Sequence, residues 1–183
     1  MSRRKARPAR PSGSARTARP AGSAASGRTT GSASSGRTTG SASSGRPRTA
    51  AVPAVTADSP CPCGLPAAYG ACCGRFHAGP ETAPTAELLM RSRYSAFVVR
   101  DEPYLLRTWA PETRPADVDF DPELRWTGLE IEETGDGTAF HQRGTVTFRA
   151  RFTHAGAPGA LHERSRFTRH EGAWVYVDGD FLD

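Results

Sequence analysis

The spacing of apolar side chains over residues 85–100 predicts an amphipathic helix. Thr85 is placed to cap its N-terminus, and Glu87 in the first turn faces the positive end of the helix dipole. Arg93 falls at the centre of the apolar face. The apolar positions of that face are Ala86, Leu89, Met90, Tyr94 and Phe97. We therefore expect this face to pack against the rest of the domain with one charged residue inside it.

A second short helix is expected after Asp101, and four strands follow it. Pro103 suits the first turn of this helix, which carries Tyr104, Leu105 and Trp109. Further along, the apolar period falls to two, which is typical of half-buried strands. The predicted strands are residues 124–133, 143–152, 161–169 and 173–180, with a turn at Gly156, Pro158 and Gly159. Helices followed by strands predict an α+β fold, with the helices packed on one face of a curved antiparallel sheet.

Alternation within the last two strands places polar side chains on the inner face of the sheet. Leu161, Glu163, Ser165 and Phe167 share one side of the third strand, and His162 lies on the other. On the fourth strand, Asp178 shares a side with Trp174 and Tyr176. A buried arginine and a buried glutamate are costly unless they meet. We therefore predict an Arg93–Glu163 ion pair, joined by Asp178.

The first part of the chain has no apolar pattern at all. Residues 1–51 contain only Ala, Arg, Gly, Lys, Pro, Ser and Thr after Met1. A nine-residue unit, GSASSGRTT with small variations, recurs between residues 22 and 46. Such a segment has nothing to bury, so residues 1–58 are predicted to be a disordered, basic, flexible tail. An alternative hypothesis is that the native chain starts later, at Val52 or Val55.

The charge of the chain divides at the same place. Residues 1–58 carry 11 basic side chains and one acidic one, whereas residues 59–183 carry 13 basic and 18 acidic ones. Weak, sequence-independent nucleic-acid binding is therefore a hypothesis for the tail alone. We find no apolar run long enough to span a bilayer and no secretory leader pattern, so a cytoplasmic location without membrane contact is expected.

All four cysteines fall within 13 residues, at Cys61, Cys63, Cys72 and Cys73. Two close pairs joined by a short loop with Gly and Pro are typical of a structural zinc site, in which four thiolates surround one ion. Disulfides are disfavoured because no leader directs the chain to an oxidising compartment. A thiol redox centre is a third reading, although neither pair is C-x-x-C. His77 is a spare candidate ligand.

The segment SPCPCGLPAAYGACC resembles the SEC-C motif, a small zinc module known from the C-terminus of the SecA translocation ATPase. Cys61, Cys63, Tyr69, Cys72 and Cys73 stand at matching places. Ala67-Ala68 stand where the motif usually carries lysines. The resemblance implies a zinc knuckle over residues 59–80 and, by analogy with SecA, a ribosome or a secretory chaperone as protein partner.

The order of the downstream segments resembles the YchJ family. These segments are MRSRYSAF at 90–97, LRWTGLEI at 124–131, LHERSRF at 161–167 and WVYVDGD at 174–180. The family joins an N-terminal SEC-C motif to a cone-shaped α+β domain of the nuclear-transport-factor type. The resemblance therefore implies such a domain over residues 84–183, and it leaves activity and oligomeric state open.

Cone-shaped domains of this type enclose a cavity in some enzymes, so a pocket has to be considered. One reading makes Arg93 and Glu163 a structural pair that fixes how the helix docks on the sheet. The sharper reading is a small-molecule pocket around that pair, for a lyase or isomerase. Its candidate residues are Arg93, Tyr94, Trp109, Trp126, Glu163, Ser165 and Asp178. A carboxylate held by an arginine has a lowered pKa and is a poor base, so we favour a non-enzymatic, zinc-containing binding or adaptor protein.

Overall fold

The computed structural model describes residues 54–183, so the predicted tail falls outside the described residues except for its last few positions. Those positions belong to the folded part. Ser59 N donates to Thr56 O, and Gly70 N donates to Ala57 O at 2.8 Å. Ordered structure therefore begins before Ser59, because the backbone of Thr56 and Ala57 closes the first loop. No helix in the described part of the chain is both long and apolar enough to cross a membrane.

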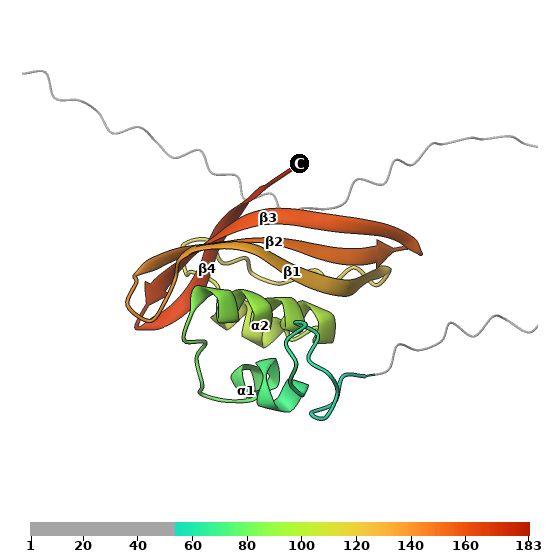
Figure 1. Ribbon diagram of the computed structural model, residues 1–183, viewed down its shortest axis with the longest axis horizontal. Coiled ribbons are helices and arrows are strands. Elements are labelled where there is room, and N and C mark those ends of the chain that lie inside the picture. The colour runs from blue at the N-terminus through green and yellow to red at the C-terminus, as the bar shows by residue number, and fades with distance from the viewer. Residues whose placement is uncertain (1–53) are drawn as a thin grey trace, which may run out of the picture. The chain divides into compact units, whose positions relative to one another are not determined.

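Within residues 54–183, three α-helices precede a four-stranded antiparallel sheet, as the α+β prediction required. The helices are α1 (Cys73–Ala78), α2 (Ala86–Val99) and α3 (Glu102–Arg107). The strands are β1 (Leu124–Asp136), β2 (Arg143–His154), β3 (Ala157–His170) and β4 (Ala173–Phe181), paired in the order β1-β2-β3-β4. Figure 1 shows the sheet curving over one side of α2, with α1 and the cysteine loop on the opposite side. The cone-shaped architecture is thereby confirmed.

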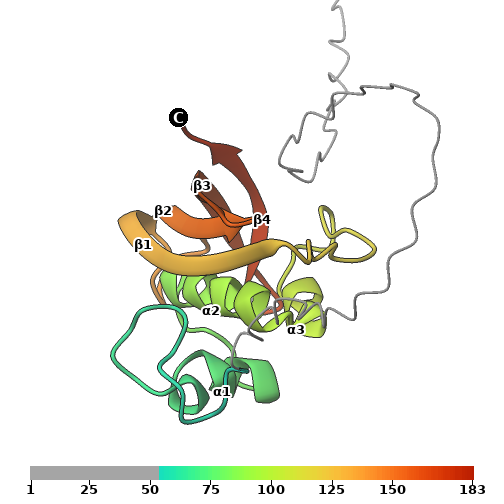
Figure 2. The ribbon, with the colours of Figure 1, turned by 90° about the vertical axis from the view of Figure 1, so that its right-hand side faces the viewer.

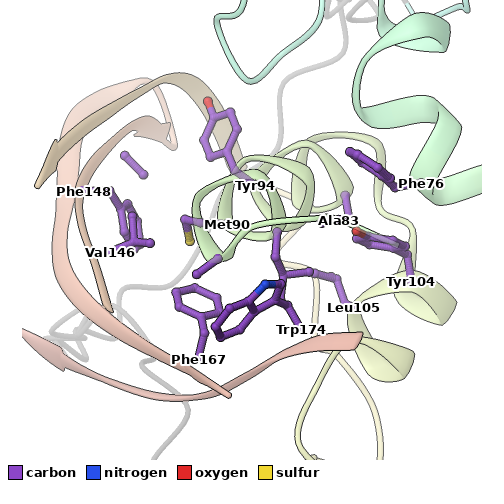
Figure 3. Close-up of a cluster of buried hydrophobic side chains, with 14 residues drawn as sticks. Phe76, Ala83, Met90, Tyr94, Tyr104, Leu105, Val146, Phe148, Phe167 and Trp174 are labelled. Carbon is purple, nitrogen blue, oxygen red and sulfur yellow. The ribbon is translucent and has the colours of Figure 1, made fainter. Parts of the chain in front are cut away.

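Helix α2 is buried on two sides. Met90 faces the sheet, where it lies near Val146 and Phe167 (Figure 3), and Leu89 belongs to the same buried cluster. The other buried side is made of small residues, because Ser92, Ser95 and Ala96 have no exposed surface. Small side chains let α1 and the cysteine loop approach the helix closely. The sequence pattern showed the first face and missed the second.

The β2–β3 hairpin closes in a tight turn that differs slightly from the predicted one. Ala155 and Gly156 both have positive φ, 49° and 84°, which is typical of a two-residue turn matched to the strand twist. Pro158 and Gly159 lie within β3, so their assignment to the turn was wrong. Both hairpin strands are longer than predicted, because only two residues are needed to reverse the chain.

The two edges of the sheet are irregular. Along β4, the segment after α3 adds a short parallel bridge, in which Ala110 N donates to Tyr176 O at 2.7 Å and Tyr176 N donates to Thr108 O at 2.9 Å. Along β1, the register with β2 shifts twice, between Trp126 and Gly128 and between Ile131 and Glu133. Figure 2 shows the chain after α3 running beside the sheet.

Candidate functional site

The first cysteine pair is positioned by a miniature hairpin. Cys61 N donates to Ala67 O at 3.0 Å, and Tyr69 N donates to Ser59 O at 2.8 Å. Between these bonds, Gly64 N donates to Cys61 O, and Gly64 has a φ of 83°, which suits glycine best. The tight turn therefore brings the sulfur atoms of Cys61 and Cys63 to the same side of the loop.

The second pair stands at the start of α1. Cys72 is the residue before the helix and Cys73 is its first residue. The next residue, Gly74, has to be a glycine because Tyr69 packs directly on it. A Cβ atom at this position would lie 2.7 Å from Tyr69 O. The glycine therefore lets the loop fold back close enough for the two cysteine pairs to meet.

The four sulfur atoms form one compact group in the interior. All of them lie within 4.8 Å of one another, and Cys63 Sγ is 3.7 Å from Cys72 Sγ. Each cysteine is at most 9% exposed. The four residues are free thiols and form their own small cluster with Leu65 and Tyr69. Such a group is able to hold a metal ion.

The pKa values of these thiols show that the four cysteines do not all ionise together without a cation. The thiol of Cys73 donates to Cys63 and lowers the pKa of Cys63 to about 5. The same bond raises the pKa of Cys73, and burial raises the pKa of Cys72 to about 12. Without a cation, one thiolate therefore forms easily and opposes the ionisation of its neighbours. A bound metal ion would remove this conflict, because it stabilises all four thiolates together.

Helix α2 supplies polar groups beside the cysteines that the sequence did not single out. Ser95 Oγ lies 3.8 Å from Cys61 Sγ, and Arg91 Nη1 donates to Cys63 O at 3.0 Å. Arg91 is also paired with Glu87 at 2.8 Å. Arg91 and Ser95 are four residues apart and thus share one side of the helix. This spacing is the only signal in the sequence that could have linked them to one site.

His77 is not part of the sulfur group. Its Nε2–H donates to Ser92 O at 2.9 Å, which leaves Nδ1 to accept from Tyr69 OH at 2.7 Å. Its ring also packs against Tyr104, with centroids 4.4 Å apart. Burial lowers the pKa of His77, so the ring is neutral. His77 therefore joins the cysteine loop to α2 and α3, and its place as a spare ligand is not supported.

Of the residues predicted to line a pocket, the structure brings only some close to one another. Arg93 is 4% exposed, and its Nη1 donates to Leu105 O and Thr108 Oγ1, each at 2.8 Å. Its guanidinium lies 4.8 Å from the ring centroid of Trp109 and 4.7 Å from that of Tyr176. Burial lowers the pKa of Arg93 to about 10. Two aromatic rings, one backbone oxygen and one hydroxyl, rather than a carboxylate, contact this charge.

The predicted Arg93–Glu163 ion pair was wrong as a direct contact. Among the described residues no salt bridge joins them, and Tyr176 stands between the two side chains. Glu163 accepts hydrogen bonds from Ser165 Oγ and, at 3.3 Å, from Tyr176 OH. Burial raises the pKa of Glu163, contrary to the lowered pKa that an ion pair would give. His162 lies on the other face, as predicted, where it contacts Glu132.

Asp178 was wrongly predicted to join this cluster. The register between β3 and β4 shifts so that Arg166 pairs with Asp178 and Phe167 pairs with Tyr176, which leaves Val177 as an extra residue. The bulge turns Asp178 to the outer face of the sheet, where it forms a salt bridge with Arg166. Gly179 takes the inner position opposite Ser165.

The aromatic candidates belong to two separate groups. Tyr94 and Trp126 pack edge to face at 5.9 Å, within a cluster that includes Phe97. Trp109 packs instead against Tyr176, and its indole Nε1 is buried without a hydrogen-bond partner among the described residues. Two hollows of the described part, one beside Thr85 and Thr134 and one beside Tyr104 and Trp174, are lined by none of the seven pocket candidates.

Fold and site together define a class of protein in which a four-cysteine knuckle is carried on a cone-shaped domain of the nuclear-transport-factor type. The family model described as "YchJ, middle NTF2-like domain" matches residues 85–179. The chain therefore belongs to the YchJ family, and the resemblance noted in the sequence is confirmed.

Relatives and a solved structure agree with this assignment. A UPF0225 protein of Streptomyces avermitilis is 69% identical over 123 residues, covering 67% of this chain and 85% of the relative. One of Streptomyces coelicolor is 65% identical over 124 residues, covering 68% of this chain and 97% of the relative. The solution structure of a SEC-C motif containing protein from Rhodopseudomonas palustris is 34% identical, with a TM-score of 0.61 over 68% of this chain and all of that one.

Proposed function

We propose that this chain is a non-enzymatic binding or adaptor protein of the cytoplasm whose four cysteines hold a structural zinc ion. The observation that carries the proposal is the closed group of four buried thiols. Zinc–sulfur bonds of about 2.3 Å in a tetrahedron separate neighbouring sulfur atoms by about 3.8 Å. The 3.7 Å between Cys63 Sγ and Cys72 Sγ fits that spacing.

A structural role suits this group better than a catalytic one. Four thiolates fill the coordination shell of zinc and leave no position for water or substrate. The cysteines are buried, and Ser95 and Arg91 contact the loop from α2. Such an ion would fix the shape of the loop and thereby the surface that the loop presents.

The adaptor role rests on the likeness of the loop to the SEC-C motif. By analogy with SecA, the partner of the knuckle is a ribosome or a secretory chaperone. Leu65 and Ala67 lie on the partly or fully exposed side of the loop, where such a partner has access. Affinity capture from cytoplasmic extract with the whole chain and with Cys72→Ser tests this role. A partner bound only by the unaltered chain supports it, and equal capture by both proteins contradicts it.

The metal itself is tested by zinc content and thiol titration of the whole chain. We expect one zinc per chain, with thiols that react only after a chelator is added. Cys72→Ser should lose the metal, whereas Ala71→Ser, an exposed neighbour, should keep it. Four reactive thiols and no metal in the freshly purified chain would overturn the assignment.

A second function, proton transfer by a lyase or isomerase, is favoured by one observation. Glu163 has a raised pKa and contacts the hydroxyl of Tyr176, and a carboxyl of raised pKa suits general acid–base chemistry. A small molecule that shields Trp109 fluorescence from a soluble quencher, and loses this effect in Glu163→Gln, would support it. No such molecule in a broad metabolite screen would count against it.

A further inference from the structure

A hollow of about 230 Å³ lies away from the cysteines and from Glu163. It is bounded by the segment of residues 79–83 that leads from α1 towards α2, by the end of α3 and by the start of β4. Four of its lining side chains are apolar or aromatic and buried, each of them at most 4% exposed: Leu89, Tyr104, Trp174 and Val175. The hollow therefore offers an apolar floor between three separate elements.

Arg107 stands at the rim of this hollow in a fixed position. Its Nη2 donates to Phe76 O and to His77 O, each at 2.8 Å. Its guanidinium carbon lies 4.6 Å from the ring centroid of Tyr104, which is itself part of the floor. Two backbone bonds and one ring contact thus hold the charged group in place, so little side-chain freedom would be lost when it binds a ligand.

The same guanidinium keeps unused hydrogen-bonding capacity. Within residues 54–183 no carboxylate oxygen lies within 4.0 Å of its nitrogen atoms, and no hydrogen bond uses its Nε or Nη1. Both hydrogen atoms of Nη2 are already used, so Nε–H and Nη1–H remain to donate single, charge-assisted hydrogen bonds to a carboxylate. A ligand that combines an apolar part with a carboxylate would therefore fit both the apolar floor and the fixed cation.

We propose that this hollow binds a small carboxylate with an apolar body. The body would rest on Tyr104 and Trp174, and the carboxylate would pair with Arg107. The volume is below the roughly 300–1,000 Å³ of pockets for drug-sized ligands, which restricts the body to about one ring or one branched chain. A free organic acid and the C-terminal residue of a peptide share this chemistry.

The carboxylate of Glu81, at the same hollow as Arg107, would repel an anionic ligand, so changing this residue gives a second test of the proposal. Glu81 also lines the hollow and is paired with Arg75 at 3.8 Å. Its carboxylate repels an anion, so Glu81→Gln should strengthen binding of a carboxylate and leave binding of a neutral molecule unchanged. Arg107→Gln should do the opposite, because it removes the cation and keeps a side chain able to donate.

The test uses the whole chain, labelled with ¹⁵N and titrated with benzoate and with benzamide, its neutral counterpart. We expect saturable shifts of the Trp174 indole and the Thr108 and Val175 amides with benzoate only. Arg107→Gln should weaken benzoate binding by about tenfold to a hundredfold, as expected for a charged hydrogen bond. No saturable shift with benzoate, or equal shifts with benzamide, would overturn the proposal.

A second variant guards against an indirect effect, because Arg107 also holds α1. Ala173→Leu would fill the hollow from β4 while leaving Arg107 in place. It should abolish the benzoate shifts and leave the circular dichroism spectrum unchanged, and unaltered benzoate affinity would contradict the assigned site. Binding of a tripeptide that ends in phenylalanine, with its C-terminus free or amidated, distinguishes a peptide terminus from a free organic acid as the natural ligand. Tighter binding of the free peptide than of benzoate indicates a peptide terminus, and weaker binding indicates a free acid.

Discussion

At the scale of single residues, the contact between Ser95 and Cys61 is the most informative. Ser95 is completely buried, and its hydroxyl lies 3.8 Å from Cys61 Sγ. Groups that hydrogen-bond to metal ligands commonly change metal affinity by about 10–100-fold when they are removed. Ser95→Ala should therefore lower zinc affinity by about tenfold, measured by competition with a chromophoric chelator. Ser92→Ala, which loses a bond to Tyr104 instead, is the matched control and should leave affinity unchanged.

Glu163 makes the stability of the domain depend on pH. Burial raises its pKa in the folded state, so the folded state binds the proton more tightly than the unfolded chain. The stability that this group contributes is therefore present at low pH and is lost as the pH rises through the raised pKa. The side chain of the Glu163→Gln variant stays neutral at every pH. We therefore expect the variant to have the higher free energy of unfolding, and its advantage over the unaltered chain to be larger at pH 7 than at pH 4.

Denaturant unfolding at both pH values measures this difference. Glu130→Gln, on the exposed outer face, is the control, and its effect should show no comparable dependence on pH. A Glu163→Gln variant that is less stable at pH 7 than the unaltered chain would show that the negative charge is needed there.

Single residues also show where sequence reasoning reached the site and where it failed. The cysteines could be found from their spacing, and the inward direction of Glu163 followed from strict alternation along β3. Asp178 could not be placed, because the bulge at Val177 depends on how β4 pairs with β3. The sequence placed Tyr176 on the same side of its strand as Trp174, yet its contacts with both Arg93 and Glu163 follow only from the three-dimensional packing.

At the scale of elements, the N-terminus of α2 depends on one side chain. Thr85 Oγ1 accepts a hydrogen bond from Leu88 N at 3.2 Å, as the sequence predicted for a cap. Removing such a cap typically costs about 0.5–2 kcal/mol. Thr85→Ala should therefore lower the free energy of unfolding by about 1 kcal/mol in urea titrations. Thr85→Ser keeps the oxygen and should stay close to the unaltered chain.

The pairing of β3 with β4 requires a residue without a side chain at position 179. A Cβ atom at Gly179 would clash with the carboxylate of Glu163, which is held by Ser165 and Tyr176. Gly179→Ala should destabilise the domain by about 1–3 kcal/mol, as overpacking usually does. Gly128→Ala in β1 is the control, because no atom lies within 4 Å of its added Cβ. Similar unfolding midpoints for the two variants would mean that Glu163 moves aside freely.

The elements themselves were largely predictable, because their signals are local. Helical spacing and a cap define α2, and alternation defines all four strands. The second buried side of α2 was missed, because Ser92, Ser95 and Ala96 carry no apolar pattern that marks them as interior. Their burial follows from contact with the cysteine loop, which is distant in the sequence.

At the scale of the whole described part, helix α1, which carries Cys73, shares a core with the cone. Phe76 from α1 is 3% exposed and belongs to the same buried cluster as Leu105 and Trp174. Arg107 and His77 add hydrogen bonds between the two parts. The sequence suggested separate segments at 59–80 and 84–183 and left their contact open. They form one packed unit.

Removing the metal should therefore weaken the cone as well as the knuckle. Zinc in small finger peptides supplies on the order of 10 kcal/mol of folding free energy. Losing even about 3 kcal/mol of it would lower the thermal midpoint by on the order of 10 °C in a domain of this size. The measurement is thermal unfolding followed by Trp fluorescence, with and without chelator, and Cys72→Ser should not respond to the chelator. A sheet that unfolds at an unchanged temperature after chelation would contradict this coupling.

The irregular sheet edges have a consequence for how this protein behaves at high concentration. An open, regular edge strand is a template on which a second chain can add its own strand and start an aggregate. Here Thr108 and Ala110 already occupy hydrogen-bonding positions along β4, and the two register shifts in β1 interrupt the other edge. We expect the folded chain to resist fibril formation even when crowded. Aggregation would then begin from molecules in which the segment after α3 has come away from β4.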